Sequence, residues 1–167
     1  VITREYDEQG RVISKNVENI GETKFKYDII INRDDMPEAS YAETTIDPKG
    51  NTTTKAYDKA GRLRYVLDGD ISAAIEATYD YYDNGNTKSV SYNSGVIEEY
   101  SYYNNNTLKS LVNKKGDGQI IESFSYEYDS ANNQVRKIDG KGTTEYSYDE
   151  LNRLSKVKEP SLKETSY

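Results

Sequence analysis

Apolar and polar residues alternate in short runs along the chain, and this pattern predicts β-strands. In the run SFSYEYD, Phe124, Tyr126 and Tyr128 share one face of an extended strand, whereas Ser125 and Glu127 lie on the other. The runs EYSYYN and TTEYSYD alternate in the same way. No segment combines helical periodicity with capping residues over more than two turns. The segment DISAAIEAT contains helix-favouring residues, but it lies where the array requires a hairpin, so we predict a loop or a strand there.

A short motif is repeated along the chain, most clearly as YDKAGRLRYV, YDEQGRV and YDELNRLSKV. We call its first tyrosine the anchor. Four residues after each anchor stands a Gly or an Asn, the residue types that adopt positive φ at low cost. The spacing therefore predicts a turn with a left-handed residue at a fixed place. The anchors are Tyr6, Tyr57, Tyr81, Tyr102, Tyr128 and Tyr148, and the turn positions are Gly10, Gly61, Gly85, Asn106, Asn132 and Asn152.

The residue after the anchor is usually Asp, whose carboxylate is predicted to accept hydrogen bonds from the turn backbone. Examples are Asp7, Asp58, Asp129 and Asp149, while Asn104 stands one place later in its copy. Three arginines, at one common position of the motif, are expected to pair with this Asp or to stack on a neighbouring tyrosine. Ligand binding is the alternative role for them. They are Arg11, Arg62 and Arg153.

Beyond the turn, apolar residues stand six and nine positions after the anchor. A gap of three does not keep two side chains on one face of a regular strand, so we predict a β-bulge or a strand end between them. The pairs are Leu63 and Val66, Leu108 and Leu111, and Leu154 and Val157.

A second turn, rich in Gly, Asn and Asp, separates one anchor turn from the next, so each unit is predicted to be strand, turn, strand, turn. The 51 residues from Tyr6 to Tyr57 leave room for two further degenerate units, with Tyr27 and Ile46 as candidate anchors. The second turns are predicted at residues 19–21, 68–70, 93–95, 115–118 and 139–142.

The repeats predict one continuous array over residues 1–167, with an irregular or inserted segment at about 29–45, around Pro37. The chain begins at Val1, and its last residues, KETSY, resemble a strand that enters another anchor. We therefore expect it to be a fragment of a longer chain. The fold class expected is all-β, an array of antiparallel hairpins that forms an extended, coiling sheet.

The composition predicts a thin core. Mean hydropathy is −0.95, yet the chain has 17 tyrosines, whose rings can be buried while their hydroxyls stay solvated or hydrogen-bonded. The net charge of −7 argues against nucleic acid and anionic membranes as partners. No apolar run approaches the ~18 residues of a membrane span.

Candidate catalytic and metal-binding residues are few, because the sequence has neither Cys nor His. We predict no enzyme activity, no cofactor and no metal. Adjacent acids, at residues 34–35 and 98–99, are expected to point to opposite faces of a strand or into solvent rather than to converge. The DGD and GDG segments at 68–70 and 116–118 suggest calcium ligands, but turn chemistry is the favoured reading.

The motif of Tyr, Asp, two free positions, Gly, Arg and Leu resembles the YD repeat, also called the Rhs repeat, and stands almost whole as YDKAGRL. In that family the repeats form a spiralling β-sheet that wraps into a hollow shell. In bacterial members the shell encloses a C-terminal toxin that is released into a neighbouring cell. The family's core motif with its autoproteolytic aspartates is not found here. DPKGN, at residues 47–51, resembles a piece of it, but a turn is favoured.

The resemblance implies a non-enzymatic shell segment of a toxin-delivery protein that acts between bacteria. Its partners would be the neighbouring repeats of the same chain and an enclosed effector domain. Its location would be secreted, or associated with the cell surface or cell wall.

A binding module is the alternative. YYDNGNTKSVSY, at residues 81–92, also resembles choline-binding repeats of cell-wall proteins, which carry ligands on tryptophan. The absence of Trp counts against that family. A strip of tyrosines is nevertheless compatible with carbohydrate or cell-wall binding, or with adhesion. A structural spacer without a ligand is the third reading.

Overall fold

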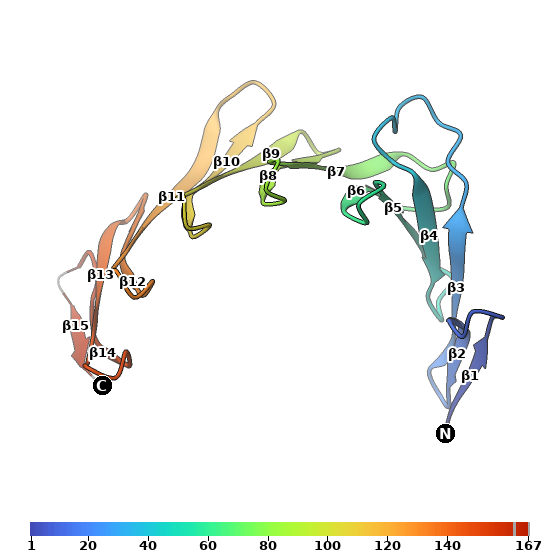
Figure 1. Cartoon of the computed structure of the whole chain (residues 1–167), viewed down its shortest axis with the longest axis horizontal. Helices are drawn as coiled ribbons and strands as arrows, with labels where there is room; N and C mark the ends of the chain where they lie inside the picture. Colours follow the sequence, from blue (N-terminus) through green and yellow to red (C-terminus); the bar gives the residue numbers. More distant parts are fainter. Residues whose placement is uncertain (162, 167) are drawn as a thin grey trace. The chain divides into compact units, whose positions relative to one another are not determined.

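The computed structural model describes residues 1–161 and 163–166, which form two compact units. The first unit comprises residues 1–79 and 92–94, and the second comprises residues 80–91 and 95 onward. Among the described residues there is no helix, and so none that is long and apolar enough to span a membrane. All strand pairs are antiparallel, and within each unit the strands follow one another in sequence order (Figure 1). The prediction of an all-β array of antiparallel hairpins is confirmed.

The first unit contains strands β1 to β6 and most of β7. They are β1 (Ile2–Tyr6), β2 (Val12–Val17), β3 (Gly21–Ile29), β4 (Tyr41–Ile46), β5 (Thr52–Tyr57), β6 (Leu63–Leu67) and β7 (Ile75–Tyr81). The second unit contains most of β8 (Thr87–Tyr92) and all of β9 (Val96–Tyr102), β10 (Leu108–Lys115), β11 (Ile120–Tyr128), β12 (Gln134–Asp139), β13 (Gly142–Tyr148), β14 (Leu154–Lys158) and β15 (Glu164–Ser166).

A β-bulge follows the anchor turns, and it explains the apolar gap of three. Tyr102 pairs with Leu108, but the next pair joins Ser101 to Ser110, so the register skips Lys109. Leu111 pairs with Tyr100, which lies on the same face as Tyr102. The extra residue therefore keeps Leu108 and Leu111 on one face, and the predicted bulge is confirmed. The same register shift occurs after Tyr6, Tyr57, Tyr128 and Tyr148.

The dry core lies in the first unit. Of the seven buried hydrophobic residues among those described, only Val90 belongs to the second unit. The core occupies the face of β4, β5 and β6 that does not carry the anchor tyrosine, where Ala42 pairs with Ala56, and Ala56 with Tyr65. The other members of this cluster are Met36 and Leu67.

Two loops cover this core. The loop at residues 30–40, between β3 and β4, contributes Met36, which is only 1% exposed. The loop at residues 68–74 packs Ile71 and Ala73 against the same cluster. Arg33 joins the two loops, because its guanidinium donates to the carbonyl oxygens of Ile71 and Ala73. The segment DISAAIEAT thus divides into loop and β7 strand, as predicted.

One expectation about the repeat count is wrong. Between Tyr6 and Tyr57 there is one further unit, whose anchor is Tyr27 on β3 and whose anchor turn is replaced by the loop at 30–40. The turn after Ile46 joins β4 to β5, so it lies at the opposite end of the strands from the turns at 7–11 and 58–62. It has the hydrogen bonds of an anchor turn, with Gly50 at φ 88°, because the same turn chemistry serves either end of a meander.

Candidate functional site

The candidate site is the row of anchor turns together with the tyrosines around them. Each turn is closed by two backbone hydrogen bonds; in the turn at 58–62, Asp58 N donates to Arg62 O at 2.9 Å and Gly61 N to Asp58 O at 3.0 Å. The fourth residue of each turn has positive φ, which runs from 58° to 88°. These residues are Gly10, Gly61, Gly85, Asn106, Asn132 and Asn152.

An aspartate in the first position fastens most of these turns. The backbone N–H groups of Ala60 and Arg62 both donate to Asp58 Oδ1 at 2.9 Å, and Arg62 Nε donates to Asp58 Oδ2 at 2.8 Å. Asp7 with Arg11, and Asp149 with Arg153, repeat these contacts. The predicted pairing of the three arginines with the turn aspartates is confirmed. In the turns at 47–51 and 129–133, an Asn takes the place of the Arg.

These contacts lower the pKa of the turn carboxylates. For Asp149 the largest cause is the hydrogen bond from the Arg153 side chain, followed by that from the Arg153 backbone. The pKa of Asp129 is lowered in the same way by Asn133. A depressed pKa in the folded state means that the carboxylates stabilise the turns as long as they are ionised.

We expect the chain to keep its stability from neutral pH down to about pH 5 and to lose it progressively below that. Because the pKa of Asp149 in the folded chain lies below the ordinary aspartate value of 3.8, its contribution to stability is present above pH 3.8 and is lost as pH falls through the folded-state pKa. The midpoint of urea unfolding, measured against pH, checks this. The variant Asp149→Asn, which has no carboxylate to protonate, should lose less on acidification. A midpoint that falls between pH 7 and pH 5 would contradict the expectation.

Asparagine in the fourth position links successive anchor turns of the second unit. Asn105 Nδ2 donates to Asn132 Oδ1 at 2.7 Å, and Asn133 Nδ2 donates to Asn152 Oδ1 at 3.0 Å. Asn106 Oδ1 accepts hydrogen bonds from two side-chain amides of the preceding turn, at 2.9 and 3.0 Å. We call this set the asparagine ladder. Sequence reasoning missed it, although the available signal is an Asn in the fourth position with Asn residues in the turn before it.

Removing one rung of the asparagine ladder should weaken the second unit. Asn132→Gly keeps a residue that tolerates positive φ but loses the hydrogen bond from Asn105, so we expect the free energy of unfolding to fall by about 0.5–1.5 kcal/mol. Asn132→Ala also places a Cβ at positive φ, which costs roughly a further 1 kcal/mol. Urea unfolding of the two variants checks that Asn132→Ala is less stable than Asn132→Gly. A glycine variant as stable as the parent chain would show that the rung contributes nothing.

The anchor tyrosines lie in contacts between neighbouring strands and are not gathered into one site. Tyr148 donates its hydroxyl to Gln134 O at 2.8 Å, and Tyr27 makes the equivalent bond to Val12 O. Tyr57 stacks on Tyr41 with ring centroids 5.2 Å apart. Burial raises the pKa of the Tyr57 hydroxyl. Tyr6 is 57% exposed.

Two turns begin with Tyr instead of Asp, and sequence reasoning did not single these tyrosines out. Tyr82 and Tyr103 donate their hydroxyls to backbone oxygens of the next repeat, Tyr100 O and Tyr126 O, both at 3.0 Å. Their rings meet the anchors Tyr102 and Tyr128 edge to face, with centroids 6.2 Å apart. A tyrosine in this position therefore fastens the turn to its neighbour rather than to itself.

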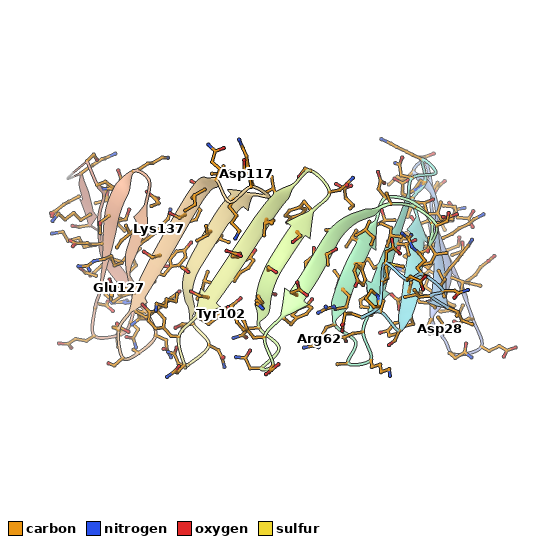
Figure 2. The ribbon with its side chains drawn as sticks, turned by 90° about the horizontal axis from the view of Figure 1, so that it is seen from above. Asp28, Arg62, Tyr102, Asp117, Glu127 and Lys137 are labelled. Atoms are coloured by element: carbon orange, nitrogen blue, oxygen red, sulfur yellow. The ribbon has the colours of Figure 1, made fainter. Side chains whose placement is uncertain are left out.

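Two open grooves lie between these turns, one on each side of the turn at 103–107. Their volumes are about 670 and 630 Å³. Tyr102, one of the labelled residues in Figure 2, lines both grooves together with Tyr103 and Asn104. The first groove is completed by Asn105, Thr107, Lys109, Glu127, Tyr128 and Asp129, and the second by Tyr82, Asp83, Asn84, Asn86, Ser101 and Asn106.

Opposite charges alternate on the face of the second unit that does not carry the anchors. Glu127, which is labelled in Figure 2, is the register partner of Arg136, and the two side chains form an ion pair at 3.0 Å. Glu145 comes next in the row. Its carboxylate lies 3.9 Å from the Arg136 guanidinium and forms an ion pair with the Lys158 ammonium at 3.5 Å. These pairs are solvent-exposed, so each contributes at most about 1 kcal/mol.

The acids considered as catalytic candidates make separate ion pairs and hydrogen bonds. Glu98 accepts the Tyr100 hydroxyl at 2.6 Å, whereas Glu99, on the other face of β9, pairs with Lys114 at 2.7 Å. Asp35 pairs with Arg33. Residues 68–70 and 116–118 lie in or beside turns, and no group of three or more Asp, Glu, His or Cys that could hold a metal occurs within 1–161 and 163–166.

Comparison with known proteins confirms the repeat resemblance. Residues 128–161 match the family model described as RHS Repeat. No curated protein sequence matches the chain. Among solved structures, the TcdB2–TccC3 crystal structure matches with a TM-score of 0.71 and 18% identity, over 92% of this chain and 9% of that one. The Photorhabdus luminescens Tc holotoxin pore matches with a TM-score of 0.63 and 18% identity, over 89% and 9%. The chain thus has the fold of a short stretch of these much longer proteins.

Proposed function

We propose that this chain is a wall segment of an Rhs-type shell that encloses a toxin and delivers it to a competing bacterium. The observation that carries the proposal is an antiparallel array in which residues 128–161 match the RHS Repeat model and whose fold matches part of a Tc toxin structure. The asparagine ladder and the tyrosine contacts support a mechanical role, because they join each repeat to the next. The role is non-catalytic, and the parent protein is secreted or displayed on the cell surface.

Protease protection tests this role in the full-length protein that carries the segment. An enclosed effector should resist digestion while the shell is intact and become sensitive when Gly61→Val opens this segment. Gly61→Asn, which tolerates positive φ, is the matched control and should keep the protection. An effector that is digested rapidly and at the same rate in all three proteins would overturn the enclosure role.

Carbohydrate binding is a second candidate, favoured by the two grooves. Both are lined by tyrosine rings and side-chain amides, and their volumes fall in the range of ~300–1,000 Å³ typical of ligand sites. Co-sedimentation of the chain with purified bacterial cell walls, with soluble wall sugars as competitors, tests it. Tyr103→Ala should abolish competed binding, whereas Tyr6→Ala, outside both grooves, should not. Absence of binding by the parent chain would eliminate this candidate and leave the shell proposal untouched.

A further inference from the structure

Asn84 and Gly85 form the only Asn-Gly pair in the sequence. An asparagine side chain can be attacked at its carbonyl carbon by the backbone nitrogen of the next residue. A side chain on that next residue obstructs the attack, and glycine has none. Around Gly85 there is also free space, since no atom lies within 4 Å of the place where a Cβ would stand.

The turn at 82–86 has fewer side-chain hydrogen bonds within itself than the turn at 58–62, because most of its side-chain bonds go to the neighbouring repeat. Its backbone bonds run from Tyr82 N to Asn86 O and from Gly85 N to Tyr82 O, both at 2.9 Å. Within the turn one side-chain bond is added, from Asn86 N to Asn84 Oδ1 at 3.1 Å. In the turn at 58–62, by contrast, one carboxylate accepts three bonds of 2.8–2.9 Å. The attacking nitrogen of Gly85 is therefore freed by opening its bond to Tyr82 O, without the loss of bonds to a carboxylate inside the turn.

From this chemistry and geometry we propose that Asn84 is a site of spontaneous deamidation and isomerisation. The Gly85 nitrogen gives up its proton and bonds to Asn84 Cγ, the side-chain nitrogen leaves as ammonia, and a succinimide ring closes. Water then opens the ring at either carbonyl, which leaves aspartate or isoaspartate at position 84. The reaction consumes one water, releases one ammonia, and involves no oxidation or reduction.

The modification would alter the first rung of the asparagine ladder. Asn84 Nδ2 donates to Asn106 Oδ1 at 2.9 Å, and a carboxylate at that place has no N–H to donate. The bond from Asn86 Nδ2 to the same oxygen, at 3.0 Å, remains. Isoaspartate also inserts a carbon into the main chain of the turn. Deamidation thus loosens the turn at 82–86 from the turn at 103–107.

Asn105 provides an internal control. It has the third position in its own turn, as Asn84 does, and its Nδ2 likewise donates to the next turn, at 2.7 Å to Asn132. The turn at 103–107 also begins with Tyr. The residue after Asn105 is Asn106, whose side chain obstructs the attack, so Asn105 is expected to be stable.

Ageing of the 167-residue chain at mildly alkaline pH tests the proposal, with peptide mapping by mass spectrometry and enzymatic methylation of isoaspartate as readouts. We expect the label to accumulate at position 84 and not at position 105. Gly85→Asn keeps a residue suited to positive φ and should abolish the modification. Asn106→Gly creates a second Asn-Gly pair and should make Asn105 reactive. Equal labelling of positions 84 and 105 in the parent chain, or unchanged labelling in Gly85→Asn, would overturn the proposal.

Discussion

Leu67→Ala should be the most damaging single truncation in the chain, with a loss of about 2–5 kcal/mol in the free energy of unfolding of the first unit. Leu67 is fully buried, in the cluster that Met36 and the two loops cover. Removal of its side chain leaves a cavity that the paired strands around it cannot readily close. Urea unfolding followed by circular dichroism, together with hydrogen exchange of the β6 amides, measures the loss.

Leu154→Ala is the matched control, because Leu154 occupies β14 of the second unit and is 38% exposed. Its truncation should cost less than about 1 kcal/mol, since little apolar surface returns to water. Equal losses in the two variants would contradict the confinement of the dry core to the first unit.

Gly61→Val should give the second large effect, a loss of about 1–3 kcal/mol. Gly61 has φ 77°, and a β-branched residue is strained there. Steric overlap adds little, because the nearest atom to an added Cβ is the Tyr41 hydroxyl at 3.9 Å. The cost is therefore one of backbone conformation, and Gly61→Asn should recover most of it, as Asn152 holds the same place in its own turn. Urea unfolding with an unchanged midpoint for Gly61→Val would show that this turn does not require positive φ.

The local features of the repeat could be predicted because they depend on neighbouring residues alone. An Asp that accepts hydrogen bonds from the backbone two and four residues later is specified within five residues. The bulge that keeps Leu108 and Leu111 on one face is indicated by the ten residues from Tyr102 to Leu111. The same locality caused the error at Ile46. Its turn has the residues of an anchor turn, and nothing in those residues says at which end of the strands the turn lies.

Features that join distant segments could not be predicted from the sequence pattern. Met36 lies in an irregular polar stretch, and its burial depends on Arg33 reaching a loop that lies 38 residues further along the chain. Thr54 reads as a polar strand residue, yet it is fully buried between the Thr44 hydroxyl and Gly69 O. The hydrogen bonds of the asparagine ladder join residues about one repeat apart. A single hairpin motif therefore contains the donor or the acceptor of each bond, but not both.

The most direct measurement of the central proposal is electron cryo-microscopy of the full-length protein that carries this segment. We expect a closed, hollow wall in which the strands of this array are continuous with those of flanking repeats, and density for an effector inside it. An array that stands as an open strip, with both faces in solvent and no enclosed density, would contradict the shell function.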